Sequence, residues 1–248
     1  MTGPVLIAVA HGSADPGAAE TVAALARQVR RLAPVVQVRT AFLRHGRPAL
    51  AELAELAGPA EVTWPAGPAG RPAGPARGPK PVPRAVIVPL LLSAGHHLEA
   101  DVGAAAERAG LPAAAPLGPD PLLSVALARR LAEAGVARGT PVVLAAAGSA
   151  DPRGPAAVRA QAAMLSQLLR APVTAAFAAA AGPTVREAVG RHRRAGRPVA
   201  VASYLLAPGR FHDLVRSAGA DRVARPIGDH AAVAAVVLDR YRGALGAR

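Results

Sequence analysis

The chain has 248 residues, of which 52% are hydrophobic and 2% are aromatic, and it carries a formal net charge of +13. This length suits one large or two small domains with cores built mainly from aliphatic side chains. The absence of cysteine excludes disulfide bonds, thiolate-bound zinc and iron–sulfur clusters. The scarcity of aromatic residues argues against a nucleic-acid partner, because single-strand binders place aromatic platforms among their basic residues.

No apolar run reaches the length needed to cross a bilayer. Residues 1–4 lead directly into a strand-like segment, without the basic and apolar regions of a signal peptide. We therefore expect a soluble cytoplasmic protein with no membrane partner. The positive charge is compatible with an acidic small-molecule ligand.

Continuous apolar runs alternate with helical patterns along the first half of the chain. The strand-like runs cover residues 5–10, 35–42 and 86–92. The helical patterns cover residues 17–32, 48–56, 99–109 and 121–134. This alternation predicts an α/β fold with a parallel sheet flanked by helices, in which residues 93–97 form a loop at the end of the third strand.

The stretch at about residues 58–84 is rich in Pro, Gly and Ala and shows no periodicity. We interpret it as a disordered or loosely ordered insertion between a helix and the next strand.

The second half of the chain repeats the first. Three ordered matches pair His11 with Ala147, His97 with Phe211, and residues 116–118 with residues 226–228. They indicate an internal duplication. We therefore predict two similar domains, residues 1–136 and residues 137–248, the second of which has lost both histidines.

His11 and His97 each follow a predicted parallel strand. Ligands of open parallel sheets bind in the crevice beyond the carboxyl ends of the strands. Two imidazoles brought together there can hold a divalent metal or accept protons near neutral pH. We predict that His96, His192 and His212 do not act as metal ligands.

Two segments carry a family resemblance. Residues 10–16, Ala-His-Gly-Ser-Ala-Asp-Pro, and residues 88–97, Val-Pro-Leu-Leu-Leu-Ser-Ala-Gly-His-His, followed by Asp101, resemble the two motifs of the CbiX/SirB-type sirohydrochlorin chelatases. The resemblance spans both halves, because many members of this family are fused tandem repeats.

The resemblance implies that His11 and His97 are the catalytic and metal-handling residues. It implies insertion of a divalent metal, Fe²⁺ first, into sirohydrochlorin for siroheme biosynthesis, with release of two protons. Cobalt insertion for cobalamin biosynthesis, insertion of Ni²⁺ and a non-catalytic tetrapyrrole or metal carrier remain alternatives. No organic cofactor is implied. The two halves can enclose the cleft within one chain, which is compatible with a monomer.

Small residues next to the histidines would let a flat macrocycle approach the backbone. They are Gly12, Ser13, Ser93 and Gly95, which we predict to bind the substrate. Glycines at strand ends are also often required only by the turn.

One position departs from the family. The family often has an acidic residue after the Phe-Leu pair that ends the second strand, where this chain has Arg44. Glu99 and Asp101 are conceivable substitutes, although acidic residues near the start of a helix also serve the helix dipole.

A different enzyme class is suggested by Arg44-His45-Gly46, which resembles the Arg-His-Gly motif of histidine phosphatases. In those enzymes the motif closes the first strand, whereas here it follows the second. The expected second His-Gly is also absent, so we interpret His45 as a solvated loop residue.

Overall fold

The computed structural model describes residues 3–57, 83–93 and 95–246, and of residues 53, 54 and 96–99 it describes the backbone alone. Nearly all of the predicted Pro/Gly-rich insertion lies outside the described residues. Within them, no helix is long and apolar enough to cross a membrane.

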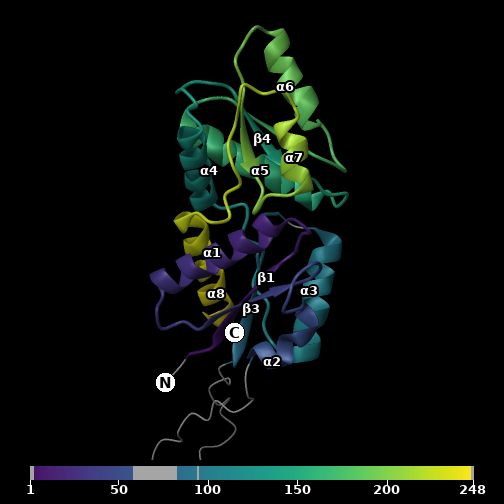
Figure 1. The fold of residues 1–248 in the computed structure, drawn as a ribbon, viewed down its shortest axis with the longest axis vertical. Helices are drawn as coiled ribbons and strands as arrows, with labels where there is room; N and C mark the ends of the chain where they lie inside the picture. Colours follow the sequence, from purple (N-terminus) through teal and green to yellow (C-terminus); the bar gives the residue numbers. More distant parts are fainter. Residues whose placement is uncertain (1–2, 58–82, 94, 247–248) are drawn as a thin grey trace, which may run out of the picture.

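The chain folds into two lobes, each built on a parallel sheet (Figure 1). The first sheet has the order β2-β1-β3 and the second has the order β5-β4-β6-β7. The elements of the first lobe's part of the sequence are β1 (Val5–Ala10), α1 (Pro16–Leu32), β2 (Val38–Phe42), η1 (Leu50–Glu52), α2 (Leu53–Ala57), β3 (Ala85–Pro89) and α3 (His96–Ala109). They are followed by α4 (Pro121–Glu133), β4 (Val142–Ala146), α5 (Arg153–Leu169), β5 (Val173–Phe177), α6 (Val185–Arg194), β6 (Ala200–Tyr204), α7 (Arg210–Arg216), β7 (Arg222–Val223) and α8 (Ala231–Gly246).

The predicted α/β fold with two similar halves is confirmed. β1 is the central strand of its sheet, β4 is an inner strand of the other, and all residues of both are buried. Leu6 pairs with Val38 on one side and with Val86 on the other, both in parallel register. A strand covered on both faces needs apolar side chains in both directions, which explains the continuous apolar runs.

Helix α3 begins earlier than the sequence pattern indicated. The prediction that residues 93–97 form a loop is wrong for His96 and His97, which lie in the first turn of α3. Gly95 is the N-cap residue, with extended backbone angles and no side-chain hydrogen bond that caps the helix. His97 is therefore carried by a helix rather than by a loop.

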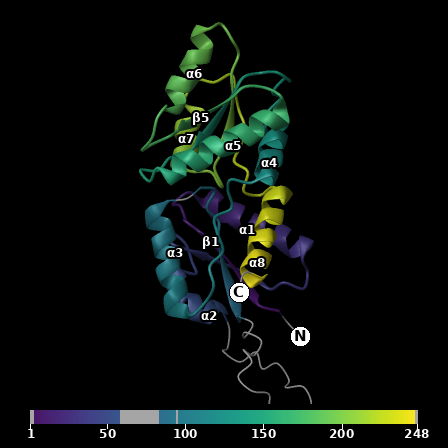
Figure 2. The same ribbon diagram turned by 180° about the vertical axis from the view of Figure 1, so that it is seen from behind.

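The last helix of each half packs on the sheet of the other half. α8 lies against α1 and β3 of the first lobe, while α4 lies against α5 and β6 of the second lobe (Figures 1 and 2). α4 and α8 also pack on each other, so one buried core runs through both lobes. The boundary between the two repeats near residue 136 stays a prediction. The lobes do not follow that boundary, because α4 of the first repeat packs on the second lobe and α8 of the second repeat packs on the first lobe.

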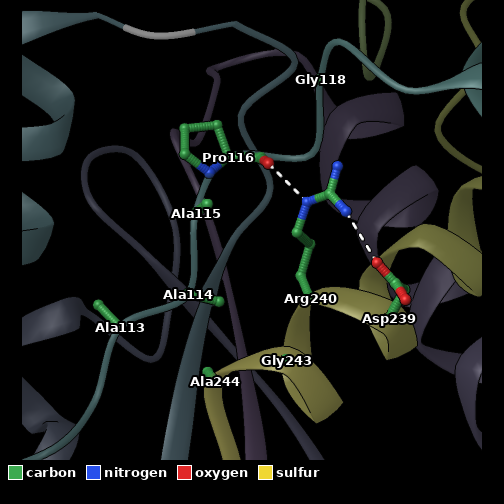
Figure 3. A pocket seen from close by; sticks show the side chains of 9 residues that line it. All are labelled: Ala113, Ala114, Ala115, Pro116, Gly118, Asp239, Arg240, Gly243 and Ala244. Atoms are coloured by element: carbon green, nitrogen blue, oxygen red, sulfur yellow. Dashed lines mark hydrogen bonds and ion pairs between the residues drawn. The ribbon is translucent and has the colours of Figure 1, made fainter. Parts of the chain in front are cut away.

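One arginine attaches each exchanged helix to the lobe that it covers. On α4, Arg130 is 3% exposed, and its Nε donates to the carbonyl of Pro226 at 3.2 Å. On α8, Arg240 Nε donates to the carbonyl of Pro116 at 2.9 Å (Figure 3). The two arginines are 110 positions apart in the sequence, and so are the two prolines. The two contacts are therefore equivalent in the two repeats.

A groove of about 530 Å³ opens beside Arg240, between residues 113–118 and α8 (Figure 3). Its walls are mainly Ala, Gly and Pro, and none of the predicted site residues lines it. Arg240 also donates to the carbonyl of Leu117 and pairs with Asp120 and Asp239. The guanidinium group of Arg240 therefore binds other groups of the protein and stabilises the fold.

Candidate active site between the lobes

Loops from the carboxyl ends of both sheets face each other across the junction of the lobes. A Cβ atom at Gly209 would lie 3.1 Å from Ser13 Oγ, and one at Gly95 would lie 4.0 Å from Ser149 Oγ. Ser13 and Ser149 are equivalent in the two repeats, and so are Gly95 and Gly209. The first loop of each lobe thus faces the second loop of the other, in an arrangement with approximate two-fold symmetry.

The first loop of each lobe has the same internal structure. Ser13 Oγ accepts from the backbone N–H of Asp15 at 3.1 Å, and Asp15 caps α1 by accepting from the N–H of Gly17 at 2.8 Å. In the second lobe Ser149 Oγ accepts from the N–H of Asp151 at the same 3.1 Å. The serines therefore shape the turns, and each hydroxyl hydrogen can still be donated to a ligand.

Gly12 is required by the turn itself. Its φ of +86° is unfavourable for other residues, and a Cβ atom there would overlap the carbonyl oxygen of Arg44. Gly148 repeats this arrangement in the second lobe, with a φ of +97° and a contact to the carbonyl of Ala179. The close approach of the backbones accounts for both glycines, and a role of Gly12 in substrate binding stays a prediction.

His11 lies directly after β1, and its side chain is exposed at the junction. Its carbonyl accepts from the N–H of Arg44 at 2.9 Å, which ties the loop after β2 to the His11 loop. Partial burial lowers the pKa of His11, and the positive charges of Arg44 and His45 lower it further. Asp101 on α3 acts in the opposite direction. His11 therefore lies between a basic loop and one acidic side chain.

His97 is the second residue of α3, which follows the strand next to β1. Its side chain, like those of His96 and Glu99, lies outside the description, so the pairing of His11 with His97 stays a prediction. Ser93 and Gly95 lie on the same connection and are partly buried. Among the side chains that are described, no three His, Cys, Asp or Glu residues form a metal-binding group.

His45 occupies an exposed turn after β2, with a φ of +38°. Its place after the second strand of the sheet differs from the position that the histidine phosphatase motif requires. Its neighbour Arg44 is also exposed, at the position where the chelatase motif often has an acid. Both side chains contribute positive charge around His11.

A polar connection between the lobes was not predicted from the sequence. Tyr204, at the end of β6, donates its hydroxyl to the carbonyl of Leu92 at 2.5 Å. Leu92 lies in the connection between β3 and α3. In the sequence Tyr204 lies among apolar residues and resembles an ordinary core residue, so no local signal distinguishes it.

His212 is on α7, next to the counterpart of His97. Its Nε2 atom is buried and has no hydrogen-bond partner among the described residues. Burial lowers the pKa of His212, and Arg216 adds to this effect, while Asp213 and Asp15 oppose it. Asp15 belongs to the first lobe, so charges from both lobes act on the pKa of His212.

We expect the free energy of unfolding to decrease as the pH falls below about 6.5, the value for histidine in an unfolded chain. Burial lowers the pKa of His212 and His230, both partly buried, in the folded state. The unfolded chain therefore binds protons first, and stability present above pH 6.5 is lost as the pH falls towards the folded-state values. Urea unfolding at pH 8 and pH 5 measures this change.

The variant His212→Gln should show a smaller loss between these two pH values, and His192→Gln on α6 serves as the matched control. An equal pH dependence in both variants would contradict a contribution from His212.

Comparisons with known proteins agree with this architecture. The CbiX family model matches residues 5–63, 78–134 and 141–244. The structure of SirB from Bacillus subtilis with Fe³⁺ is similar, with a TM-score of 0.75 at 22% identity over 98% of this chain and 96% of that chain. A multi-domain protein from Deinococcus radiodurans, described as structurally similar to chelatases, has a TM-score of 0.67 at 18% identity over 97% of this chain and 55% of its own. No curated protein sequence matches the chain.

The chain belongs to the CbiX/SirB-type sirohydrochlorin chelatase family, in a form with repeated CbiX segments. The predicted family is thereby confirmed. Membership makes the chain a metal chelatase, an enzyme that inserts a metal ion into a tetrapyrrole.

Proposed function

We propose that this chelatase inserts Fe²⁺ into sirohydrochlorin for siroheme biosynthesis, using His11 and His97 at the junction of the lobes. The observation that carries the proposal is the position of His11. It lies exposed at the carboxyl end of the central strand of its sheet, beside loops that approach the second lobe. This is where open α/β sheets bind their ligands.

The proposed chemistry needs two different groups. Metal insertion displaces two protons from pyrrole nitrogens, and a neutral imidazole can accept a proton or bind the incoming metal. One imidazole nitrogen cannot do both at once, so two histidines on neighbouring elements provide a division of roles. The substrate carries many carboxylates, for which the exposed Arg44 is a candidate partner.

Iron is favoured over cobalt because the similar SirB structure is described with Fe³⁺. Imidazole ligands suit both metals, so the metal that the enzyme uses must be measured. We also propose a monomeric enzyme, since both sides of the junction come from one chain.

The direct test is anaerobic metal insertion into sirohydrochlorin, followed by absorbance with Fe²⁺, Co²⁺ or Ni²⁺. Substrate is supplied in at least tenfold excess over protein. We expect several turnovers per chain with Fe²⁺, faster than the reaction without protein. Formation of at most one product per chain would instead identify a carrier, and faster turnover with Co²⁺ would assign the enzyme to cobalt insertion.

We expect Arg44→Glu to raise the affinity for Co²⁺ or Fe²⁺ about tenfold, because it replaces a positive charge near His11 with a negative one. Metal titration against a competing chelator measures this affinity. Arg31→Glu is the matched control, since it makes the same charge change at the end of α1 farther from His11, roughly 22 Å along the helix from Pro16. Equal changes in both variants would show a general charge effect and contradict a local one.

A further inference from the structure

Backbone hydrogen bonds hold most of the segment that leaves β3. The N–H of Leu90 donates to the carbonyl of Val9 at 2.7 Å, and the carbonyl of Leu91 accepts from the N–H of Leu117 at 2.8 Å. The carbonyl of Leu92 instead accepts from a side chain, the hydroxyl of Tyr204. α3 begins four residues later and carries His97 in its first turn.

The Tyr204 ring is buried in the second lobe, where its hydroxyl lies beside Gln161. Tyr204 is 2% exposed, and its hydroxyl lies 3.5 Å from Oε1 of Gln161, a fully buried residue of α5. Gln161 is fixed in turn by hydrogen bonds to the backbone of Asp120 and to the hydroxyl of Ser124. Burial also raises the pKa of Tyr204, so its hydroxyl remains a donor across the physiological pH range.

The two repeats differ at this point. In the second repeat the carbonyl of Leu206, the counterpart of Leu92, accepts from the backbone N–H of Gly228 at 2.8 Å. In the first repeat the equivalent carbonyl is bound by Tyr204 of the other lobe. The counterpart of Tyr204 in the first repeat is Leu90, which has no hydroxyl. The connection is therefore one-sided, and it acts on the repeat that has kept its histidines.

We propose that Tyr204 is a positioning residue that fixes the connection between β3 and α3, and thereby the place of His97, from the second lobe. This inference rests on the proposed role of His97 in metal insertion. It gives the second repeat, which lacks both histidines, a function at the site of the first repeat. The hydrogen bond from Tyr204 to Leu92 would then fix both the orientation of the lobes and the position of His97.

Tyr204→Phe is the test, because it keeps the ring and removes the hydroxyl that binds Leu92. Tyr241→Phe is the matched control. Tyr241 is 4% exposed, and its hydroxyl donates at 2.6 Å to the carbonyl of Pro4, at the opposite end of β1 from His11. Each variant loses one buried hydrogen bond between a tyrosine and a carbonyl, so we expect similar decreases in Tm.

Hydrogen exchange followed by mass spectrometry reports on the connection without requiring activity. We expect the amides of Leu90 and Leu117, whose hydrogen bonds lie on the same connection as the Leu92 carbonyl, to exchange about tenfold faster in Tyr204→Phe and to be unchanged in Tyr241→Phe. We also expect kcat for metal insertion to fall about tenfold in Tyr204→Phe alone, because small displacements of a reacting group are costly. The KM for the tetrapyrrole should stay within about threefold of wild type, since the hydroxyl is directed at the protein backbone.

Equal exchange in the two variants would overturn the inference, as would faster exchange with an unchanged kcat. If exchange accelerates in Tyr204→Phe but the wild type inserts no metal, the proposed function fails while the fixing of the connection stands. Should Tyr204→Phe fail to fold, Gln161→Met is measured instead. It keeps the hydroxyl but replaces the polar group that lies 3.5 Å from it with an apolar one, and it should also accelerate exchange at Leu90 and Leu117.

Discussion

Replacing His11 with alanine is expected to lower kcat/KM for metal insertion at least about 100-fold, the effect of losing a proton acceptor or metal ligand. The free energy of unfolding should change by less than about 0.5 kcal/mol, because the side chain is exposed. His97→Ala should lose activity to a similar extent. Anaerobic insertion assays and urea unfolding on the same preparations measure the two quantities.

His45→Asn is the matched control for these variants. His45 is an exposed histidine on the adjoining loop, and asparagine tolerates its positive φ. Activity should remain within about threefold of wild type, since a change of this kind leaves the reacting groups in place. Full activity in both His11→Ala and His97→Ala would overturn their assignment, and loss of activity only in His45→Asn would direct attention to the loop after β2.

Gly118→Ala is expected to reduce the free energy of unfolding by about 3 kcal/mol or more. A Cβ atom at Gly118 would overlap the hydroxyl of Tyr204 and the carbonyl of Leu92, and it would lie 3.2 Å from Leu123 Cδ1. Neither the carbonyl of Leu92 nor the hydroxyl of Tyr204 can move away without breaking the hydrogen bond that joins the two lobes. Urea unfolding measures the loss.

Gly103→Ala provides the opposite expectation for the same substitution. Gly103 lies inside α3, and none of the described residues outside this helix comes within 4 Å of a Cβ atom built there. Alanine is the better helix former, so this variant should gain about 0.5–1 kcal/mol. If the two glycine variants had the same stability, the close packing at Gly118 would be contradicted.

The local pattern of the sequence was sufficient for the elements and for the repeat. Strands such as residues 5–10 are apolar throughout because both faces of their sheets are covered, and this continuous run is visible without coordinates. The recurrence of Gly-Ser-Ala-Asp-Pro at residues 12–16 and 148–152 reflects the same turn and helix cap in both halves. His11 could be placed because it directly follows such a strand.

The start of α3 could not be read from this pattern. The first turn of a helix needs no apolar periodicity, and the N-cap residue Gly95 has no side chain that would indicate a cap in the sequence. His96 and His97 therefore resemble loop residues in the sequence, although the backbone carries them on a helix.

The sequence by itself determined the fold class, the duplication, the family and the position of His11, since each depends on neighbouring residues or on a repeated motif. Only the tertiary structure decided that α4 and α8 exchange lobes, because either sheet could accept the apolar face of either helix. It also decided that Tyr204 reaches Leu92, a contact between residues 112 positions apart. Such contacts depend on how the lobes are placed, and no local pattern specifies that placement.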